Sequence, residues 1–243
     1  MIAKLVAQWR HLRPAAAYYR RDGDFYQDRE GGYFSVSFSQ EAEDLVVDQL
    51  MGFPQSGFYV DVGALHPVRY SNTYLFYRRG WHGVNIEPTP DAIALFQKRR
   101  SRDTNLNLGI SSEAGELTLY CMNDPALNTF DAERKNFLER ETPYRCVSTV
   151  VVPTRPLAQV LAEHIGDQPI DFLTIDVELH EKQVLESNDW NRFRPRFVLV
   201  EILKVEPEAL PNDPIHRIMK TNGYSLAAMT GRTAVYRDGR RAP

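Results

Sequence analysis

The chain has 243 residues, of which 43% are hydrophobic and 25% are charged, and this composition is typical of a globular protein rather than a disordered one. No apolar stretch approaches the roughly 18 residues that a membrane-spanning helix requires. The formal net charge of -3 excludes a basic field over the whole chain, so we expect no nucleic-acid partner.

The two cysteines, Cys121 and Cys146, are too few for a disulfide framework. They form neither a CxxC pair nor a spacing with histidine that would indicate zinc. We therefore expect two inert thiols in a reducing compartment, and the sequence predicts a cytoplasmic protein.

Residues 1–21 form a basic amphipathic segment with five Lys or Arg residues, no acid, and apolar residues at roughly helical spacing. We interpret this segment as a helix packed on its own domain; the alternative is a surface helix that contacts anionic lipid or a partner chain. Residues 22–38 are expected to be a polar connector. The predicted organisation is therefore a helix and connector over 1–38, followed by one domain over 39–243.

From residue 39 onward, short apolar runs alternate with helical patterns. Helices are predicted over 39–51, 72–80, 90–100 and 156–165, and strands over 57–64, 82–88, 104–111, 170–177 and 196–203. Two extra strands, 115–120 and 145–153, flank a charged, mobile excursion over 121–144, and the tail ends in a hairpin. This alternation predicts an α/β fold with a mainly parallel sheet covered by helices on both faces, in which ligands bind at the carboxyl ends of the strands.

The first predicted strand ends in Asp61, Gly63 and Ala64. A glycine at this turn lets the backbone approach a ligand closely. The G-x-G-x-x-G fingerprint of dinucleotide-binding proteins is absent, and an acid at this place would repel a pyrophosphate. These features exclude a nicotinamide-dependent oxidoreductase and favour a ligand with a cationic amino-acid group.

The second predicted strand ends in Glu87, 26 residues after Asp61. Related folds place an acid that binds ribose hydroxyls about 20 residues along the chain. Acids at two neighbouring strand ends suit an adenosine with an amino-acid arm, and S-adenosylmethionine fits that description. The alternative interpretation is a pair of solvated carboxylates at strand ends.

The strand over 170–177 is followed by further acids, Asp176 and Glu178. If the strand continues, both carboxylates point to one face, where they can share a divalent cation or divide proton transfer and positioning between them. The alternative is that they cap the following helix. Glu201 follows a buried VLV run, where an unpaired carboxylate is costly, so we expect it to meet a substrate hydroxyl or a structural salt bridge.

Two histidines are candidate bases. His66 lies in the loop after Gly63, and His180 follows Glu178; each can take a proton from an alcohol near neutral pH. Trp81 and Trp190 are expected to fill the core or its rim.

Several sequence blocks, in order, resemble FkbM-type S-adenosylmethionine-dependent methyltransferases from about Ser39 to Asp238. The blocks are SQEAEDL, FYVDVGALHPVRYSNT, GWHGVNIEP, NLNLGIS, ALNTF, IDFLTIDVE, VLESNDW and RPRFVLVE. The resemblance implies a class I methyltransferase fold, which is Rossmann-like with a mainly parallel seven-stranded sheet. It also implies methyl transfer to an oxygen, commonly on a sugar, a glycan or a polyketide-type product.

The resemblance places the cofactor at Asp61, Gly63, Ala64 and Glu87, beside the loop that follows Asp176. Two further cofactor contacts are expected from position: Asn72, where a helix opens, and Asn107, on the adenine side.

One residue departs from the family pattern. Where the family usually reads D-V-E-G, this chain has Leu179 after Glu178, so a glycine that permits tight backbone geometry is replaced. We expect Leu179 to line a narrower or more apolar acceptor pocket. The alternative is that it marks a chain that binds the cofactor poorly.

The resulting hypothesis is an O-methyltransferase in which Asp176 and Glu178 act at the acceptor end, directly or through Mg²⁺, with His66 or His180 as the base. Methyl transfer from a sulfonium is an in-line displacement, so alignment of the reacting atoms can supply most of the catalysis. The rival hypothesis is a catalytically degenerate subunit that binds a partner. The sequence names neither the acceptor nor the oligomeric state, and a homo-oligomer is compatible with both hypotheses.

Overall fold

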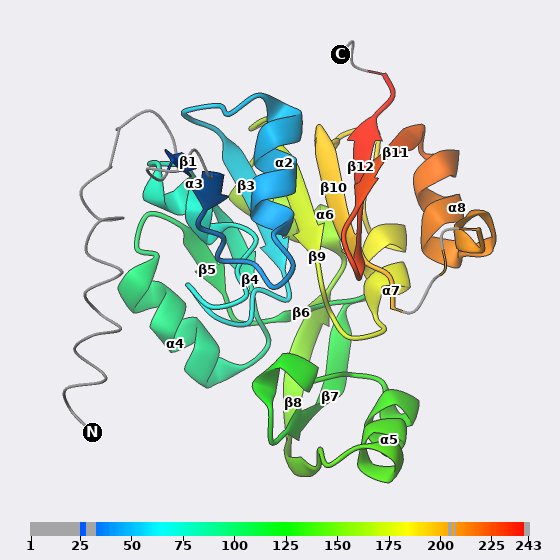
Figure 1. Cartoon of the computed structure of the whole chain (residues 1–243). Helices are drawn as coiled ribbons and strands as arrows, with labels where there is room; N and C mark the ends of the chain where they lie inside the picture. The colour runs from blue at the N-terminus through cyan, green and yellow to red at the C-terminus, as the bar shows by residue number, and fades with distance from the viewer. Residues whose placement is uncertain (1–24, 28–32, 204–205, 207, 241–243) are drawn as a thin grey trace.

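The computed structural model describes residues 25–27, 33–203, 206 and 208–240, so the predicted helix over 1–21 lies outside the described residues. The described part contains a seven-stranded sheet, a three-stranded sheet and a two-stranded hairpin. Helices pack on both faces of the seven-stranded sheet (Figure 1).

The seven-stranded sheet has the order β11-β12-β10-β9-β3-β4-β5. Its strands, in chain order, are β3 (Phe58–Val62), β4 (His82–Ile86), β5 (Thr104–Leu106), β9 (Phe172–Ile175), β10 (Phe197–Glu201), β11 (Tyr224–Met229) and β12 (Thr233–Asp238). The five strands from β10 to β5 are parallel, and β12 runs antiparallel to both of its neighbours. The predicted mainly parallel sheet and the closing hairpin are therefore confirmed.

The central strands are buried on both sides. Every residue of β3, β9 and β10 is buried, as expected for parallel strands between two layers of helices. On one face lie α6 (Leu157–His164), α7 (Glu181–Glu186) and α8 (Pro214–Thr221), whose apolar side chains join the largest core cluster. On the other face lie α2 (Glu43–Met51) and α3 (Tyr74–Arg78), which pack on a second cluster that includes Tyr59 and Trp81. Trp190 is also buried, as predicted.

Most predicted elements exist with shorter bounds, but three predictions are wrong. The strand over 104–111 is two strands, because β5 joins the large sheet and β6 (Gly109–Ile110) joins the small one. The connector contains a hairpin of β1 (Phe25–Gln27) and β2 (Tyr33–Ser35). The excursion over 121–144 is not a mobile loop, because it folds into η1 (Pro125–Leu127) and α5 (Ala132–Glu141).

Helices α7 and α8 were not predicted. α7 has only six residues, too few to show a helical period. α8 carries a start signal, because Asp213 accepts hydrogen bonds from the backbone of Ile215 and His216 and is followed by Pro214.

The inserted unit between β5 and α6 stands beyond the carboxyl ends of β3, β4 and β9 (Figure 1). It pairs β6, β8 (Cys146–Arg155) and β7 (Gly115–Met122) in the order β6-β8-β7. Its helix α5 begins at the cap residue Asp131, whose carboxylate accepts a hydrogen bond from the backbone N–H of Arg134 at 2.6 Å. The insertion therefore covers the edge of the large sheet where ligands bind in such folds.

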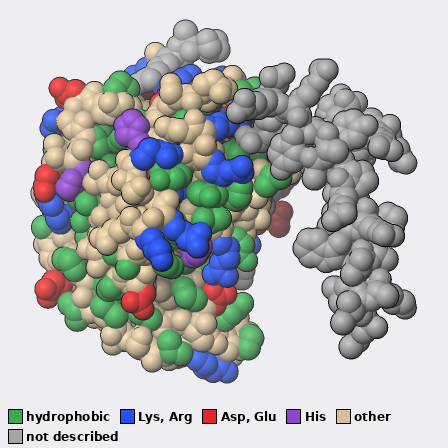
Figure 2. All heavy atoms as spheres, turned by 90° about the vertical axis from the view of Figure 1, so that its left-hand side faces the viewer, with side chains coloured by type: hydrophobic (Ala, Val, Ile, Leu, Met, Phe, Trp, Pro, Cys, Tyr) green, Lys and Arg blue, Asp and Glu red, His purple; other side chains and the backbone are tan. Residues whose placement is uncertain are grey.

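The side of the molecule that carries α3 and α4 (Pro90–Arg99) shows Lys and Arg side chains gathered near its middle (Figure 2). Arg78 and Arg99, the last residues of these helices, are exposed. Among the described residues, no helix is both long enough and apolar enough to cross a membrane.

Candidate active site

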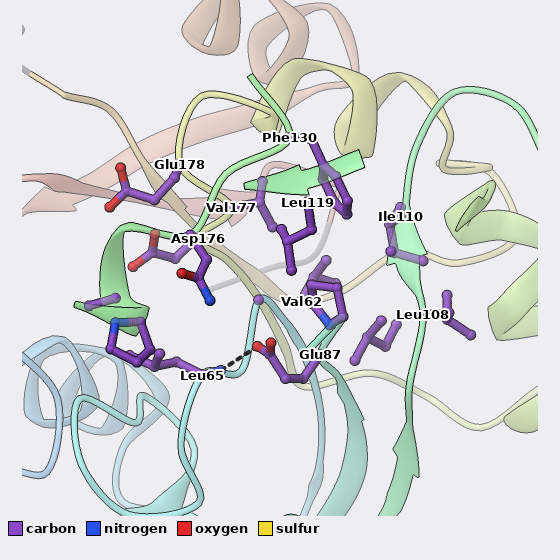
Figure 3. Close-up of a pocket in the computed structure, with 17 residues that line it drawn as sticks. Val62, Leu65, Glu87, Leu108, Ile110, Leu119, Phe130, Asp176, Val177 and Glu178 are labelled. Atoms are coloured by element: carbon purple, nitrogen blue, oxygen red, sulfur yellow. Dashed lines mark hydrogen bonds between the residues drawn. The ribbon is translucent and has the colours of Figure 1, made fainter. Parts of the chain in front are cut away.

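Two adjoining cavities open at the carboxyl ends of the central strands. The first, of about 60 Å³, has apolar walls that include Ile86, Leu108, Ile110, Leu119 and Phe130. In Figure 3 the side chains of Leu108 and Ile110 lie on one side of it and the carboxylates of Asp176 and Glu178 on the other. The second, of about 290 Å³, is bordered mainly by polar side chains. Both cavities share Gly63, Leu65, Ala126, Asp176 and Glu178, so they form one pocket with an apolar end and an acidic end.

Gly63 joins the ends of two strands at this pocket. Its φ of 82° is in the left-handed region, and a Cβ at this position would lie 1.8 Å from the carbonyl oxygen of Asp176. The backbone N–H groups of Gly63 and Ala64 both donate to the carbonyl of Ile86. A glycine is thus required because the backbones after β3 and β9 touch.

Glu87, at the end of β4, is buried and borders the apolar cavity. One carboxylate oxygen accepts a hydrogen bond from the N–H of Leu65 and the other from the N–H of Thr89, each at 2.8 Å (the bond to Leu65 is drawn in Figure 3). Burial raises the pKa of Glu87, and the bonds to Thr89 and Leu65 oppose that shift. Asn107 borders neither cavity: its side-chain amide donates to the carbonyls of Glu87 and Pro88 and so braces this loop.

Asp61, in β3, is buried at the wall of the larger cavity, as predicted from its place near a strand end. Burial raises its pKa to about 6, although a hydrogen bond from the hydroxyl of Thr73, 2.8 Å long, lowers it. Asn72 borders the same cavity, and its amide donates to the hydroxyl of Thr174 in β9 at 2.9 Å. Thr73 and Asn72, which are neighbours in the loop before α3, thus bind Asp61 in β3 and Thr174 in β9 at the wall of the cavity.

Behind Asp61 lies an arginine that the sequence analysis missed. Arg100 is fully buried, and its guanidinium donates to the hydroxyl of Thr73 at 2.9 Å and to the carboxylate of Asp103 at 2.9 Å. Arg100 therefore acts on Asp61 through Thr73. Arg100 is the last of three consecutive basic residues, Lys98, Arg99 and Arg100, and nothing in the sequence distinguishes it from the exposed Arg99.

Three carboxylates meet at the acidic end of the pocket: Asp176, Glu178 and Glu201 each place one oxygen within 4.8 Å of the others. The expectation that strand alternation aligns Asp176 with Glu178 is wrong, because β9 ends at Ile175 and Glu178 has a φ of 52°. Glu201 arrives from β10, which is paired in parallel with β9. The adjacency of these strand ends brings the three residues together.

Negative charge at this cluster is only partly compensated. Burial raises the pKa of all three acids, and neighbouring carboxylates are the next cause for Asp176 and Glu201. Asp176 is open to the solvent in the cavity, whereas Glu178 accepts two hydrogen bonds from Arg134 of α5, at 2.8 and 3.1 Å. One oxygen of Glu201 is buried and has no hydrogen-bond partner among the described residues.

Neither histidine borders the cavities in this structure. His66 uses Nδ1 to accept hydrogen bonds from the backbone N–H groups of Val68 and Arg69, and burial lowers its pKa. His180 shares a hydrogen bond of 3.1 Å with Ser111 and meets the ring of Phe130 edge-on, and burial lowers its pKa as well. Both side chains are engaged in local structure next to the pocket.

The insertion supplies pocket residues that the sequence analysis did not identify. They include Asp124, Ala126, Leu127, Asn128, Phe130 and Tyr144, which border one or both cavities. The capping acids Asp124 and Asp131 are the sequence signals that mark this segment as folded.

Leu179 has a φ of 75°, a left-handed conformation that glycine adopts without strain. Its side chain is 45% exposed and borders neither cavity. The expectation that Leu179 lines a narrowed acceptor pocket is therefore wrong, because the turn after β9 directs its side chain elsewhere.

The strand order, with β12 antiparallel at its place beside β10, and the glycine turn between two strand-end acids define a class I S-adenosylmethionine-dependent methyltransferase. The chain belongs to the FkbM methyltransferase family, because the Methyltransferase FkbM domain matches residues 61–226. The match begins within β3 and ends within β11, and it includes Asp61, Glu87, Asp176, Glu178 and Glu201.

Comparison with solved structures gives similar folds at low identity. The fibrillarin pre-rRNA processing protein of Methanococcus jannaschii is 10% identical, with a TM-score of 0.48 over 90% of this chain and 84% of that chain. The O-methyltransferase of Bacillus cereus, solved with SAH, is 12% identical, with a TM-score of 0.42 over 95% of this chain and 88% of that chain. No curated protein matches the chain.

Proposed function

We propose that the chain is an S-adenosylmethionine-dependent O-methyltransferase that acts on a hydroxyl of a sugar, a glycan or a related natural product. The observation that carries the proposal is the bipartite pocket, in which an apolar end and an acidic end meet at Gly63. A cytoplasmic setting forms part of the proposal and agrees with the two free thiols, Cys121 and Cys146.

In the proposed complex, the adenine occupies the apolar cavity and the ribose hydroxyls donate to Glu87. A carboxylate has about four lone-pair sites, so Glu87 can accept these bonds while it holds the N–H groups of Leu65 and Thr89. The amino-acid arm crosses Gly63 into the larger cavity, where Asp61 faces its ammonium group and Asn72 lies beside it. Asn107 supports the site by bracing the loop that carries Glu87.

The acceptor hydroxyl is proposed to lie at the acidic end, against Asp176 and Glu178. Its oxygen forms a bond to the methyl carbon as the carbon–sulfur bond breaks, and the electron pair of that bond stays on sulfur. The hydroxyl proton goes to Asp176, which faces the cavity and has a pKa raised by desolvation from the surrounding protein and by the nearby carboxylate of Glu178, whereas Glu178 is held by Arg134. Mg²⁺ at these carboxylates is the alternative means of activating the hydroxyl.

His66 and His180 remain alternative bases in the proposal. Because neither borders a cavity, each would have to change its side-chain conformation to reach an acceptor. Asp176 needs no such change, so we assign it the proton-accepting role.

A hydroxyl-rich acceptor suits the walls of the larger cavity. Gln40, Asp124, Tyr144 and Arg232 border it and offer hydrogen-bond donors and acceptors, while Tyr70 offers an aromatic face. This mixture fits a sugar ring better than a purely apolar acceptor.

The first test is calorimetric titration of the full chain with S-adenosylmethionine and with S-adenosylhomocysteine. We expect both to bind and Asp61→Asn to weaken S-adenosylmethionine at least tenfold, because the substitution removes the charge that faces the ammonium group. Glu116→Gln, an exposed acid of β7, is the matched control and should leave the affinity unchanged. Absence of binding by both ligands would instead favour the degenerate, partner-binding subunit.

The second test is transfer of a labelled methyl group to a panel of glycosides. Asp176→Asn should abolish transfer while cofactor affinity and the thermal midpoint are retained. Methyl transfer by Asp176→Asn at the parent rate would show that Asp176 is not the base, and His66 and His180 would then be the candidates.

A further inference from the structure

The acidic end of the pocket contains a carboxylate that hydrogen bonding does not explain. Glu201 is only 7% exposed, and its Oε2 has no hydrogen-bond partner among the described residues. A buried carboxylate oxygen without a partner is costly, so its presence calls for a ligand. Glu201 borders the larger cavity, and one of its carboxylate oxygens lies in the cluster with Asp176 and Glu178.

The cations nearest to this cluster are committed to other contacts. Arg134 pairs with Glu178 through one oxygen only, Oε2, which leaves Oε1 for another ligand. Arg232 borders the same cavity, but its side chain and its backbone N–H both bond to Glu41. Among the described residues, Arg134 is thus the one cation hydrogen-bonded to these three carboxylates, while the charge of Arg232 acts on Glu178 and Glu201 without a direct bond.

The spacing of the three oxygens suits a divalent cation. Oxygen ligands on opposite sides of Ca²⁺ lie about 4.6 to 5.2 Å apart, and on opposite sides of Mg²⁺ about 4.2 Å, as follows from their usual bond lengths. No two of the three oxygens are farther apart than 4.8 Å, so even the widest pair can lie on opposite sides of Ca²⁺, and a small contraction brings that pair to the Mg²⁺ distance. The cavity of about 290 Å³ also leaves room for several coordinating waters, each of which occupies about 30 Å³.

We propose that Asp176, Glu178 and Glu201 bind one divalent cation, with Glu201 as a ligand that reaches the site from β10. The ion satisfies the buried oxygen of Glu201 and offsets the charge of the cluster. Its catalytic role, which is to hold the acceptor oxygen and favour its deprotonation, rests on the alternative form of the proposed methyl transfer, in which the cation rather than Asp176 activates the hydroxyl; its binding rests on neither form.

The test is metal binding by the full chain after treatment with a chelator. Electron paramagnetic resonance of added Mn²⁺ and calorimetry with Mg²⁺ and Ca²⁺ should show one saturable site. Glu201→Gln keeps the shape of the side chain and should weaken Mn²⁺ binding at least tenfold. Asp176→Asn, at a position open to the cavity, should do the same without disturbing the core.

The matched control is Asp124→Asn. Asp124 borders the same cavity but is outside the cluster, so this variant removes equal charge without removing a ligand. We expect its Mn²⁺ affinity to stay within threefold of the parent. Absence of a saturable site, or equal weakening by Asp124→Asn and Glu201→Gln, would overturn the proposal.

Titration of S-adenosylmethionine without added metal separates the two proposals. Cofactor binding without any cation site would refute the metal inference alone. Cation binding without cofactor binding would refute the proposed methyltransferase activity while it supports the metal site.

Discussion

At the residue scale, the two turns that close the pocket use left-handed backbone for different reasons. Gly63 has this conformation where its backbone touches that of Asp176, so no side chain fits. Leu179 has it at a surface position where a side chain does fit and only the local backbone is strained. Gly63→Ala and Leu179→Gly should therefore have opposite effects on the free energy of unfolding.

Gly63→Ala should lower the free energy of unfolding by about 2 kcal/mol or more, because the new Cβ collides with the carbonyl of Asp176 and the φ is unfavourable. Leu179→Gly should raise it by up to about 1 kcal/mol, because relief of left-handed strain exceeds the added freedom of the unfolded chain. Urea denaturation measures both. A clear loss of stability in Leu179→Gly would show that its side chain makes a stabilising contact.

The buried carboxylate of Asp61 predicts how cofactor affinity depends on pH. Burial raises its pKa to about 6, so the group is ionised at neutral pH and becomes protonated as the pH falls through 6. The cationic amino group of S-adenosylmethionine favours the ionised form, so affinity should be constant at neutral pH and decrease below it. Thr73→Val removes a hydrogen bond that lowers this pKa and should move the midpoint to higher pH. Calorimetric titration with S-adenosylmethionine at several pH values measures the pH at which affinity is half lost. The same midpoint in Thr73→Val and the parent would contradict the prediction.

At the scale of elements, the sequence predicted those parts whose own pattern reveals them. β3, β9 and β10 are buried at every position, and their apolar runs are visible in the chain. α5 is different, because it buries only Leu138 among charged residues and resembles a solvated loop. Its packing depends on contacts from outside the segment, which no local pattern contains.

The residues of the candidate site also fall into two groups: those that a local sequence pattern reveals and those whose grouping depends on strand order. Asp61, Gly63 and Glu87 were predicted because each stands at the end of an apolar run. The grouping of Glu201 with Asp176 depends on the pairing of β10 with β9, and strand order is not written in a single sequence. The expected alternation of Asp176 and Glu178 failed because the strand stops at Ile175, two residues before its predicted end at 177.

The insertion is fastened to the pocket by Arg134, and this contact can be tested. Arg134 and Glu178 are both about one-tenth exposed, so Arg134→Ala leaves a largely buried carboxylate without its partner. We expect a loss of about 1 to 3 kcal/mol in stability and faster hydrogen exchange in α5. Arg140→Ala removes an equal charge from the same helix at an exposed position, where the ion pair with Glu141 contributes little, and should change neither quantity. Unchanged exchange in Arg134→Ala would mean that other contacts hold the insertion.

At the scale of the whole molecule, a buried ionic network links the layer of helices to the sheet behind the candidate site. Arg100, just after α4, bonds to Asp103, to the hydroxyl of Tyr59 in β3 and to Thr73 before α3. Asp103 also accepts hydrogen bonds from the backbone of Gly83 in β4. One guanidinium thus connects two strands, two helices and, through Thr73, the carboxylate of Asp61.

Arg100→Ala should lower the free energy of unfolding by about 3 to 5 kcal/mol, because it leaves Asp103 charged and buried without its partner. Arg99→Ala, one residue earlier and exposed, should change it by less than about 0.5 kcal/mol. Guanidinium denaturation of both variants measures the difference. If unfolding stays two-state in Arg100→Ala, the network is part of the global core. A separate early transition would mean that the Arg100 network stabilises only the part of the sheet around β3 and β4. Equal stability of the two variants would contradict the role of Arg100 in stabilising the fold.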